Sequence, residues 1–280
     1  MTKIYDLSDP AKPVFIRDFG LAGQEPGSTG PIPVAHGAHG PIVVGNRVYF
    51  AHGTSGEGML QIVDRQKLLT GPKEPTAANL TYPEISRLYM SPNWGGHTAF
   101  PVLGVTIADW AANTKERVRD FVVLVSEATA NECRESRHAT FVVDVTTETR
   151  PFSVATFQVP ESKGAFCRRG GRFGPHASSE SFAPIFYRKL VFISYFNGGV
   201  RAMDVRDPYA PREAAFYIPA TTERTAERCV TNGTRSCKVA IQTNNVEADE
   251  RGFVYLADRA NTGLHIVRLT GAAARIVGGN

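Results

Sequence analysis

One pattern recurs along this chain and constrains its fold more than any other feature. Four times, an apolar strand leads through a short Gly-containing turn to a second strand, which ends in Asp in all but the last copy, where Arg268 stands. The first strands of the four copies are Val48–His52, Phe121–Glu127, Leu190–Tyr195 and Phe253–Asp258. A fifth copy of the second strand lies at Ile4 and is followed, like two others, by a Pro-bearing connection. Repetition of this kind predicts a fold assembled from similar units.

The spacing of the copies indicates the size of each unit. The positions that close the second strands (6, 64, 144, 204 and 268) lie 58 to 80 residues apart, enough for a four-stranded sheet with its loops. This spacing suits the blades of a β-propeller better than solenoid coils of about 20 to 30 residues. A β-sandwich is the alternative, but it gives no reason to reuse one Asp-x-x-Asp-Pro-x-x-Pro connection. We therefore expect an all-β chain that forms a single propeller domain over residues 1–280, with blade pieces near 1–25, 33–92, 95–160, 174–220 and 241–280.

The first copy is shorter than the other four. It has the third strand of a blade, Lys3–Leu7, and the outer strand, Val14–Phe19, but no inner pair. Ala272–Val277 could add one strand, which is too few to replace both. We expect four complete four-stranded blades plus a half blade at the N-terminus, in the C-terminal portion of a longer propeller or in one that another chain completes. The only short helix expected covers Val105–Glu116.

The Asp residues that close the second strands carry a separate expectation. Each precedes a turn whose backbone amides need an acceptor, which a short carboxylate side chain supplies. We therefore interpret Asp6, Asp64, Asp144 and Asp204 as structural.

Three stretches resemble a known group of proteins: Ile4–Pro13, Phe141–Val145 and Gly199–Pro208. They are similar to the repeats of the bacterial β-propeller proteins named for their LVIVD motif, and the resemblance extends over most of the chain. It implies the propeller fold but no particular activity, because many members have no assigned function. Members are typically longer, with an export signal and more blades.

Composition removes several classes of protein. With 42% hydrophobic residues the chain is not disordered, and no stretch approaches the roughly 18 apolar residues of a membrane helix. The net charge of +4 comes from scattered basic residues, which disfavours nucleic acid as a partner. The first residues, Met1–Asp6, lack the apolar core of a signal peptide, so any export signal must lie outside this sequence.

Alignment of the copies places four polar residues at one position, just before the inner strand: His39, His97, His176 and Asn245. In a propeller the inner strands begin around the central channel, so these side chains would converge on its axis. Neutral imidazole is a good ligand for divalent transition metals. We therefore expect Fe, Mn, Cu or Zn held by these four residues with Glu127 as a carboxylate ligand. Propeller oxygenases that cleave carotenoids are similar in architecture alone, holding iron by four axial histidines.

A structural role for the same histidines stays open, because a His beside Gly in a repeated turn can bond the backbone of the next blade. His36 could also replace His39 as a ligand, since the His36–His39 segment contains Gly. His138 and His265 fall on third strands, away from the axis, and are interpreted as structural.

The alignment predicts a second polar ring. It lies at the end of the apolar strand that precedes the Asp-terminated strand in each blade. Its members are His52, Glu127, Tyr195 and Asp258. Glu127, Tyr195 and Asp258 are the catalytic candidates, as a general base or as groups that orient water or substrate, and Glu180 is a weaker one.

Two other motifs give little support for a function. Arg168–Arg172 contains two glycines but does not join a strand to a helix as a phosphate loop would. Ser178 and Ser179 lack the Gly-x-Ser-x-Gly turn of a serine hydrolase.

The four cysteines form two expected pairs. Cys229 and Cys237 flank an Asn-Gly hairpin signal that would bring them together, and Cys133 and Cys167 lie in loops near the same blades. Two disulfides imply an oxidising compartment, so we expect a periplasmic or secreted protein. Four reduced cysteines in the cytosol are the alternative.

These features support two hypotheses of function. The first is a metal-dependent extracytoplasmic enzyme, of hydrolase, lyase or oxygenase type, that acts on a small-molecule substrate. The second is a non-catalytic protein-interaction scaffold with contact surfaces at Thr70–Met90 and Thr221–Lys238. It could bind another chain at the first blade or form a homo-oligomer.

Overall fold

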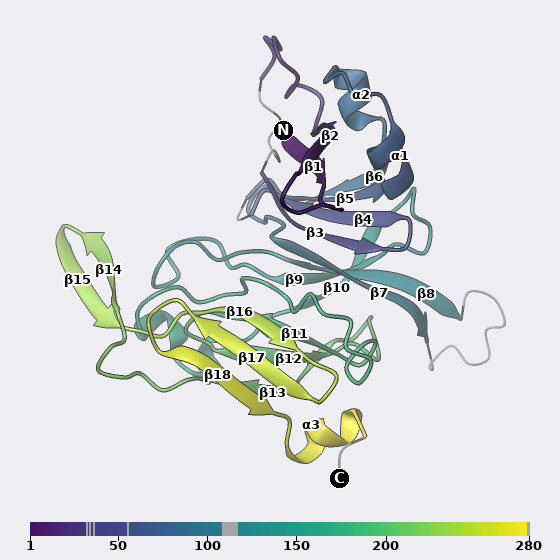
Figure 1. Ribbon diagram of the computed structural model, residues 1–280. Helices are drawn as coiled ribbons and strands as arrows, with labels where there is room; N and C mark the ends of the chain where they lie inside the picture. Colours follow the sequence, from purple (N-terminus) through teal and green to yellow (C-terminus); the bar gives the residue numbers. More distant parts are fainter. Residues whose placement is uncertain (32, 34, 36, 55, 108–116, 279–280) are drawn as a thin grey trace.

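The computed structural model describes residues 1–31, 33, 35, 37–54, 56–107 and 117–278, and this part of the chain is all-β. It contains six antiparallel sheets: two with four strands, two with three and two with two (Figure 1). The two-stranded sheets are β1 (Thr2–Asp6) with β2 (Val14–Phe19), and β14 (Glu227–Asn232) with β15 (Thr234–Val239).

The four larger sheets are meanders, in which strands that follow each other in the chain are neighbours. The first four-stranded sheet contains β3 (Ala38–Val44), β4 (Arg47–His52), β5 (Met59–Asp64) and β6 (Glu84–Tyr89). The second contains β7 (Thr98–Thr106), β8 (Val118–Val125), β9 (Thr140–Asp144) and β10 (Phe152–Phe157). The three-stranded sheets are β11 (Leu190–Ser194), β12 (Val200–Asp204) and β13 (Arg212–Tyr217), and β16 (Thr243–Ala248), β17 (Phe253–Asp258) and β18 (Gly263–Arg268). The expected strand order within the repeats is therefore confirmed.

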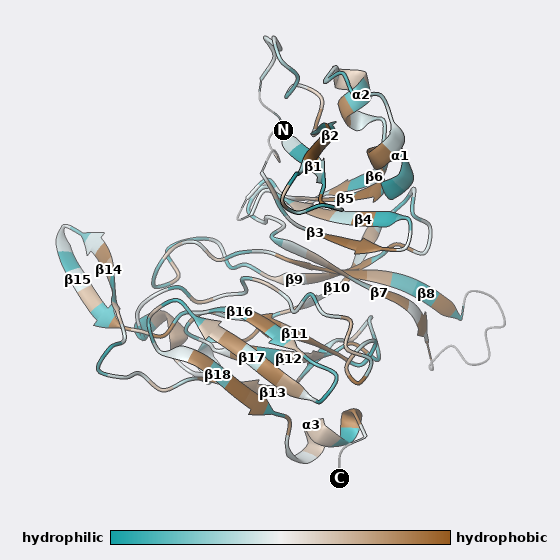
Figure 2. Cartoon of the chain, in the orientation of Figure 1, coloured by the Kyte–Doolittle hydropathy of each residue, from teal (hydrophilic) through white to brown (hydrophobic). Residues whose placement is uncertain are grey.

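Successive sheets pack face to face, which follows from the alternation of side chains along each strand. Tyr49 and Phe50 are neighbours on β4, but Phe50 packs with Phe19 of β2 whereas Tyr49 belongs to the core shared with β8 and β9. The pairs that represent the four interfaces in chain order are Phe19 and Phe50, Tyr49 and Phe141, Val142 and Ile193, and Phe192 and Leu256. Figure 2 shows hydrophobic residues concentrated on these strands. Strands β4, β8 and β12 are consequently buried on both faces, whereas β17 of the last sheet is fully buried on one face only.

Two sheets have fewer strands than expected. Before β11, the segment around His176 makes a short ladder rather than a full strand: Ser178 bridges Ile193, and Ser179 N–H donates to the Phe192 carbonyl over 2.8 Å. After β18, the chain forms helix α3 (Gly271–Ile276) where a strand over Ala272–Val277 was expected. Three consecutive alanines favour a helix over a strand, which explains this correction.

The remaining helices are short. They are α1 (Arg65–Thr70), α2 (Ala77–Thr81) and the 3-10 turns Glu161–Lys163 and Phe166–Arg168. The helix expected over Val105–Glu116 is wrong at its start, because Val105 and Thr106 belong to β7, and residues 108–116 lie outside the described part of the chain. In the part that is described, no helix is long and apolar enough to cross a membrane.

The Asp residues that close the second strands have the structural role expected of them. Asp6, Asp144 and Asp204 each accept a hydrogen bond from the backbone N–H two residues later, at 2.8 to 3.0 Å. Asp64 instead accepts from Lys67 N–H, because helix α1 follows and the carboxylate caps it.

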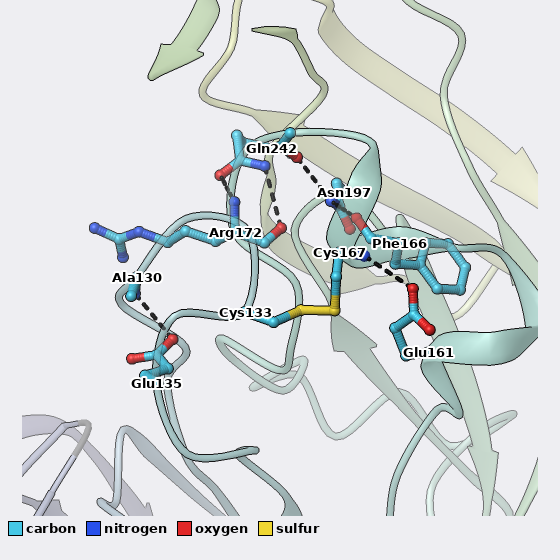
Figure 3. Close-up of a disulfide and its surroundings, with 10 residues drawn as sticks. Ala130, Cys133, Glu135, Glu161, Phe166, Cys167, Arg172, Asn197 and Gln242 are labelled. Atoms are coloured by element: carbon cyan, nitrogen blue, oxygen red, sulfur yellow. Dashed lines mark hydrogen bonds between the residues drawn. A yellow bond between two sulfur atoms is a disulfide. The ribbon is translucent and has the colours of Figure 1, made fainter. Parts of the chain in front are cut away.

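Both expected cysteine pairs are disulfides. Cys229 and Cys237 stand opposite each other on β14 and β15, the hairpin that turns at Asn232 and Gly233. Cys133 joins Cys167, 34 residues later, with their Cα atoms 5.4 Å apart (Figure 3). This second bridge ties the loop after β8 to the turn that precedes the His176 segment.

Candidate metal centre

Three histidine rings lie side by side, as the alignment of the repeats predicts: His39 belongs to β3, His97 lies directly before β7, and His176 lies in the segment before β11. The ring centroids of His39 and His97 are 3.6 Å apart, and those of His97 and His176 are 4.4 Å apart. The backbone of each histidine is paired with a residue near the end of a neighbouring strand, β8, β11 or β4. His97 N–H donates to the Val125 carbonyl, His176 N–H donates to the Ser194 carbonyl, and His39 is paired with Ala51. The sheet register therefore determines where the rings meet.

The carboxylate of Glu127 completes the cluster. Its Oε2 lies 3.7 Å from Nε2 of His97, and its Oε1 lies 3.7 Å from Nε2 of His176. One ligand atom from each of these three residues lies within 4.8 Å of the others. The exposed fractions of His97, Glu127 and His176 are 3%, 8% and 6%, whereas His39 is exposed. The cluster is thus a buried group of three with His39 on its open side.

The proton positions in the cluster follow from its hydrogen bonds. Nδ1 of His176 lies against the Asn244 carbonyl oxygen, which only accepts, so Nδ1 carries the proton and Nε2 carries a lone pair. Burial lowers the pKa of His176 to about 4. Burial, together with the neighbouring His176 and His39 rings, lowers that of His97 to about 3. Both rings are therefore neutral at pH 7. Nε2 of His176 and Oε1 of Glu127 then face each other as two acceptors.

Arg172 lies on the other side of the same carboxylate. Its guanidinium donates to Oε1 of Glu127 over 2.9 Å and to the Ala128 carbonyl over 3.2 Å. A charge-assisted bond of this kind fixes the carboxylate orientation and offsets part of its charge. Arg172 therefore bonds Oε1, the oxygen that also faces His176, and leaves Oε2 to His97.

The remaining residues of the predicted site lie elsewhere. Asn245 is exposed and its amide oxygen accepts from the Asn244 side chain, because a bulge between Thr243 and Asn245 shifts the register of β16. Asn244 supplies the contact instead, through its backbone. Tyr195 is buried in the core, where its hydroxyl oxygen accepts from Val159 N–H. Asp258 accepts from the N–H groups of Gln242 and Ala260 and so holds a loop.

The other polar candidates lie outside the cluster. His52 lies 3.0 Å from the Gln61 amide oxygen, and burial lowers its pKa to about 4. A carboxylate oxygen of Glu180 lies beside Gly40, and burial followed by the charge of Glu247 raises its pKa. His36 lies outside the described residues.

The two histidines interpreted as structural also have local partners. His138 contacts Ser126 and Glu135, and His265 contacts Thr262. Of the two, His265 lies on β18, whereas His138 lies just before β9 rather than on it.

A second group of possible ligands is ruled out by its chemistry. Glu227, Cys229 and Cys237 also lie within ligand distance of one another, but both sulfurs are in a disulfide and offer no thiolate.

Sequence reasoning missed Arg172 and Asn244. Arg172 lies four residues before His176, in a segment dismissed as a phosphate loop, and Asn244 acts through its backbone, so its side chain gave no signal.

Comparison with known proteins gives no further assignment: no family model matches the chain, and no curated protein matches it.

Proposed function

We propose that His97, Glu127 and His176 hold a divalent transition metal and that the protein is a metal-dependent enzyme. The observation that carries this proposal is the pair of acceptors formed by Nε2 of His176 and Oε1 of Glu127, 3.7 Å apart in a buried site. Two lone pairs that face each other without a proton between them repel, and a cation between them removes the repulsion.

The distances suit such an ion. Metal–ligand bonds of about 2.1 Å in a tetrahedral arrangement put ligand atoms about 3.4 Å apart. The two separations of 3.7 Å would need only a small contraction of the side chains. Two imidazoles and one carboxylate suit Fe, Mn, Cu or Zn and leave coordination positions free. When bound, the metal would supply Lewis acidity or activate a water or dioxygen molecule.

Residues around the three ligands have separate roles in this proposal. The Asn244 carbonyl holds His176 in the tautomer that presents Nε2, and Arg172 orients Glu127. His39, stacked on His97 and exposed, stands where substrate would approach and is the group placed to exchange a proton there or to act as a fourth ligand. Tyr195 and Asp258 have no part in this proposal, because their polar atoms are committed to backbone groups.

The proposal includes the architecture and the compartment. Stacking of the sheets in chain order, with the inner edges meeting at the histidines, supports an open β-propeller related to the LVIVD-repeat proteins. The two disulfides support a periplasmic or secreted location, where such bonds persist.

Metal content tests the proposal directly. The protein is produced in an oxidising compartment, and bound metals are measured by elemental analysis after incubation with Fe, Mn, Cu or Zn and removal of excess. We expect about one ion per chain in the wild type and a large loss in His97→Ala and His176→Ala. His265→Gln, which alters a histidine outside the cluster, is the matched control and should retain the metal. A wild type that retains none of the four metals would overturn the proposal.

A second candidate, an interaction scaffold, is favoured by one edge. Strand β18 is the last of its sheet, and Leu264 and Ile266 on it are 64% and 56% exposed. An uncovered apolar edge strand can pair with a strand of another chain, here a second copy. Sedimentation velocity should then show a dimer that Leu264→Lys with Ile266→Lys disrupts. A concentrated wild type that sediments as a monomer would contradict this candidate.

A further inference from the structure

An open pocket of about 440 Å³ adjoins the candidate metal centre on the side of Arg172. Its lining residues are all polar or basic: Thr129, Asn131, Arg172, Arg228, Gln242 and Arg259. The pocket therefore presents three guanidinium groups and no carboxylate of its own.

These three cations lack a full set of counter-charges. Arg172 is paired with Glu127, but no carboxylate among the described residues lies within 4.0 Å of the guanidinium of Arg228 or Arg259. Nε of Arg228 is buried and has no hydrogen-bond partner. Partial burial, followed by the charge of Arg172, lowers the pKa of Arg259, although Glu127 and Asp258 oppose this. Positive charge is thus concentrated at the pocket, where Nη2 of Arg228 also donates to the Arg259 carbonyl over 3.0 Å.

The position of Arg172 is set by a clamp on its backbone. Its N–H donates to Oε1 of Gln242 over 3.0 Å, and the Gln242 amide donates back to the Arg172 carbonyl over 3.4 Å (Figure 3). Gly171 has a φ of +67°, and a Cβ there would lie only 2.4 Å from the Gln242 amide nitrogen. A larger residue at 171 would break the clamp. In Figure 3 the Arg172 side chain extends away from the Cys133–Cys167 bridge.

Two guanidinium groups share one aromatic support. Arg172 and Arg259 lie 5.4 and 4.8 Å from the centroid of the Phe196 ring. Contact with a π-face holds a cation in place without neutralising it. Both groups are thereby ordered, although Nη1 of Arg172 is already bonded to Glu127 and to the Ala128 carbonyl.

Both disulfides stand at the walls of the pocket. Arg228 precedes Cys229 on β14, and Asn131 lies two residues before Cys133. The Asn131 side-chain amide donates to the Cys229 carbonyl over 2.9 Å, so the two walls are joined. Arg228 is consequently on a braced strand rather than on a free loop.

We propose that this pocket binds an oxyanion group, a carboxylate, phosphate or sulfate, held by Arg172, Arg228 and Arg259. Guanidinium groups match oxyanions in geometry and charge, and paired contacts are stronger than neutral hydrogen bonds. The assignment of this oxyanion to the substrate rests on the proposed metal-dependent function, because Arg172 touches Glu127 and lines the pocket at once. The substrate is then a small anionic molecule whose charged end lies at the arginines and whose reacting atoms face His97 and His176.

The test measures anion binding by isothermal titration calorimetry on the full chain with its disulfides intact. Phosphate, sulfate and malonate are the probes at constant ionic strength, with chloride as the reference anion, and their order of affinity separates the three oxyanion types. Arg228→Gln and Arg259→Gln should each weaken the best probe roughly tenfold, and more when combined. Arg150→Gln, which changes an exposed arginine that does not line the pocket, is the matched control.

Metal-dependent and pocket-dependent binding are separated by measuring metal content in the same samples. His97→Ala should lose metal but keep the anion, and His97→Gln serves if the alanine variant does not fold. A wild-type protein that binds the anion but no metal would overturn the proposed function. The oxyanion pocket would still be supported. The pocket is overturned if no probe binds better than chloride, if the double arginine variant binds as the wild type does, or if anion binding disappears with His97.

Discussion

His138 and the pair of His97 and His176 are both buried beside a glutamate, yet their hydrogen bonds differ. Nε2 of His138 lies 3.3 Å from Glu135, its Nδ1 lies 2.7 Å from the Ser126 hydroxyl, and Glu135 also accepts from Thr129 and Ala130. Each of these contacts joins a donor to an acceptor.

At Glu127 the two histidine nitrogens stand 3.7 Å away, outside hydrogen-bond distance. The same residue types therefore form a closed hydrogen-bonded network in one place and, in the other, a cluster whose facing nitrogen and oxygen atoms are not hydrogen-bonded. Residue identity and burial alone do not distinguish the two, whereas the pairing of donors with acceptors does.

We expect the largest effect on metal binding from a substitution of Glu127, compared with the same substitution of Glu135. Glu127→Gln should weaken metal binding by at least about 100-fold, because an amide is a poorer ligand than a carboxylate, whereas Glu135→Gln should leave it unchanged. Competition with a chromogenic chelator measures both affinities. Equal losses in the two variants would erase the distinction between the sites.

A smaller loss is expected at Arg172. Arg172→Gln keeps the ligands but removes the bond that orients Glu127, so metal affinity should fall about tenfold. Arg169→Gln, three residues earlier, is the neighbouring control for the same chelator titration. An affinity that matches the wild type would show that the carboxylate needs no such support.

For stability we expect the substitution of His138 to cost more than the substitution of His97. His138→Ala leaves Glu135 and Ser126 without a buried partner and should cost about 2–3 kcal/mol in the free energy of unfolding. His97→Gln, measured in the presence of a chelator, should cost less than about 1 kcal/mol because no hydrogen bond from its ring to Glu127 is lost. Urea denaturation followed by circular dichroism gives both values, and a larger loss at His97 would contradict the comparison.

The closed network also predicts a dependence on pH. Burial alone would raise the pKa of Glu135, but hydrogen bonds with His138, Ala130 and Thr129 outweigh it and lower the pKa below 4.5. The stabilisation is therefore present above about pH 4.5 and is lost as the pH falls through the lower folded-state value. Urea midpoints measured between pH 6 and pH 3 should fall more steeply for the wild type than for Glu135→Gln. Parallel curves would show that Glu135 does not contribute.

The smallest effect concerns Tyr195. Tyr195→Phe removes one hydrogen bond with Val159 in the core and should cost about 1 kcal/mol of stability, with metal content unchanged. Thermal unfolding and elemental analysis of the same preparation check this. A loss of metal in this variant would restore Tyr195 to the site.

The repeats made much of this structure predictable. Alternation of apolar residues, the Asp-terminated strands and the Asn-Gly turn near Cys229 act within a few residues of one another, so the strands and the hairpin disulfide follow from local chemistry. Equivalent positions in similar units also bring His39, His97 and His176 together. Prediction failed where one copy departs from the rest, as at the bulge that turns Asn245 outward and at α3.

Short-range patterns and equivalence between copies are enough to predict the repeated unit, the all-β class, the Cys229–Cys237 pair and the row of histidines. The tertiary structure alone shows that Tyr195 and Asp258 stay outside the cluster that Glu127 forms with His97 and His176. It also decided that Arg172, Arg228 and Arg259 share one pocket, although they are up to 87 residues apart in the chain. Sheet register and side-chain direction set these contacts, and a one-residue shift reverses the face on which a side chain lies.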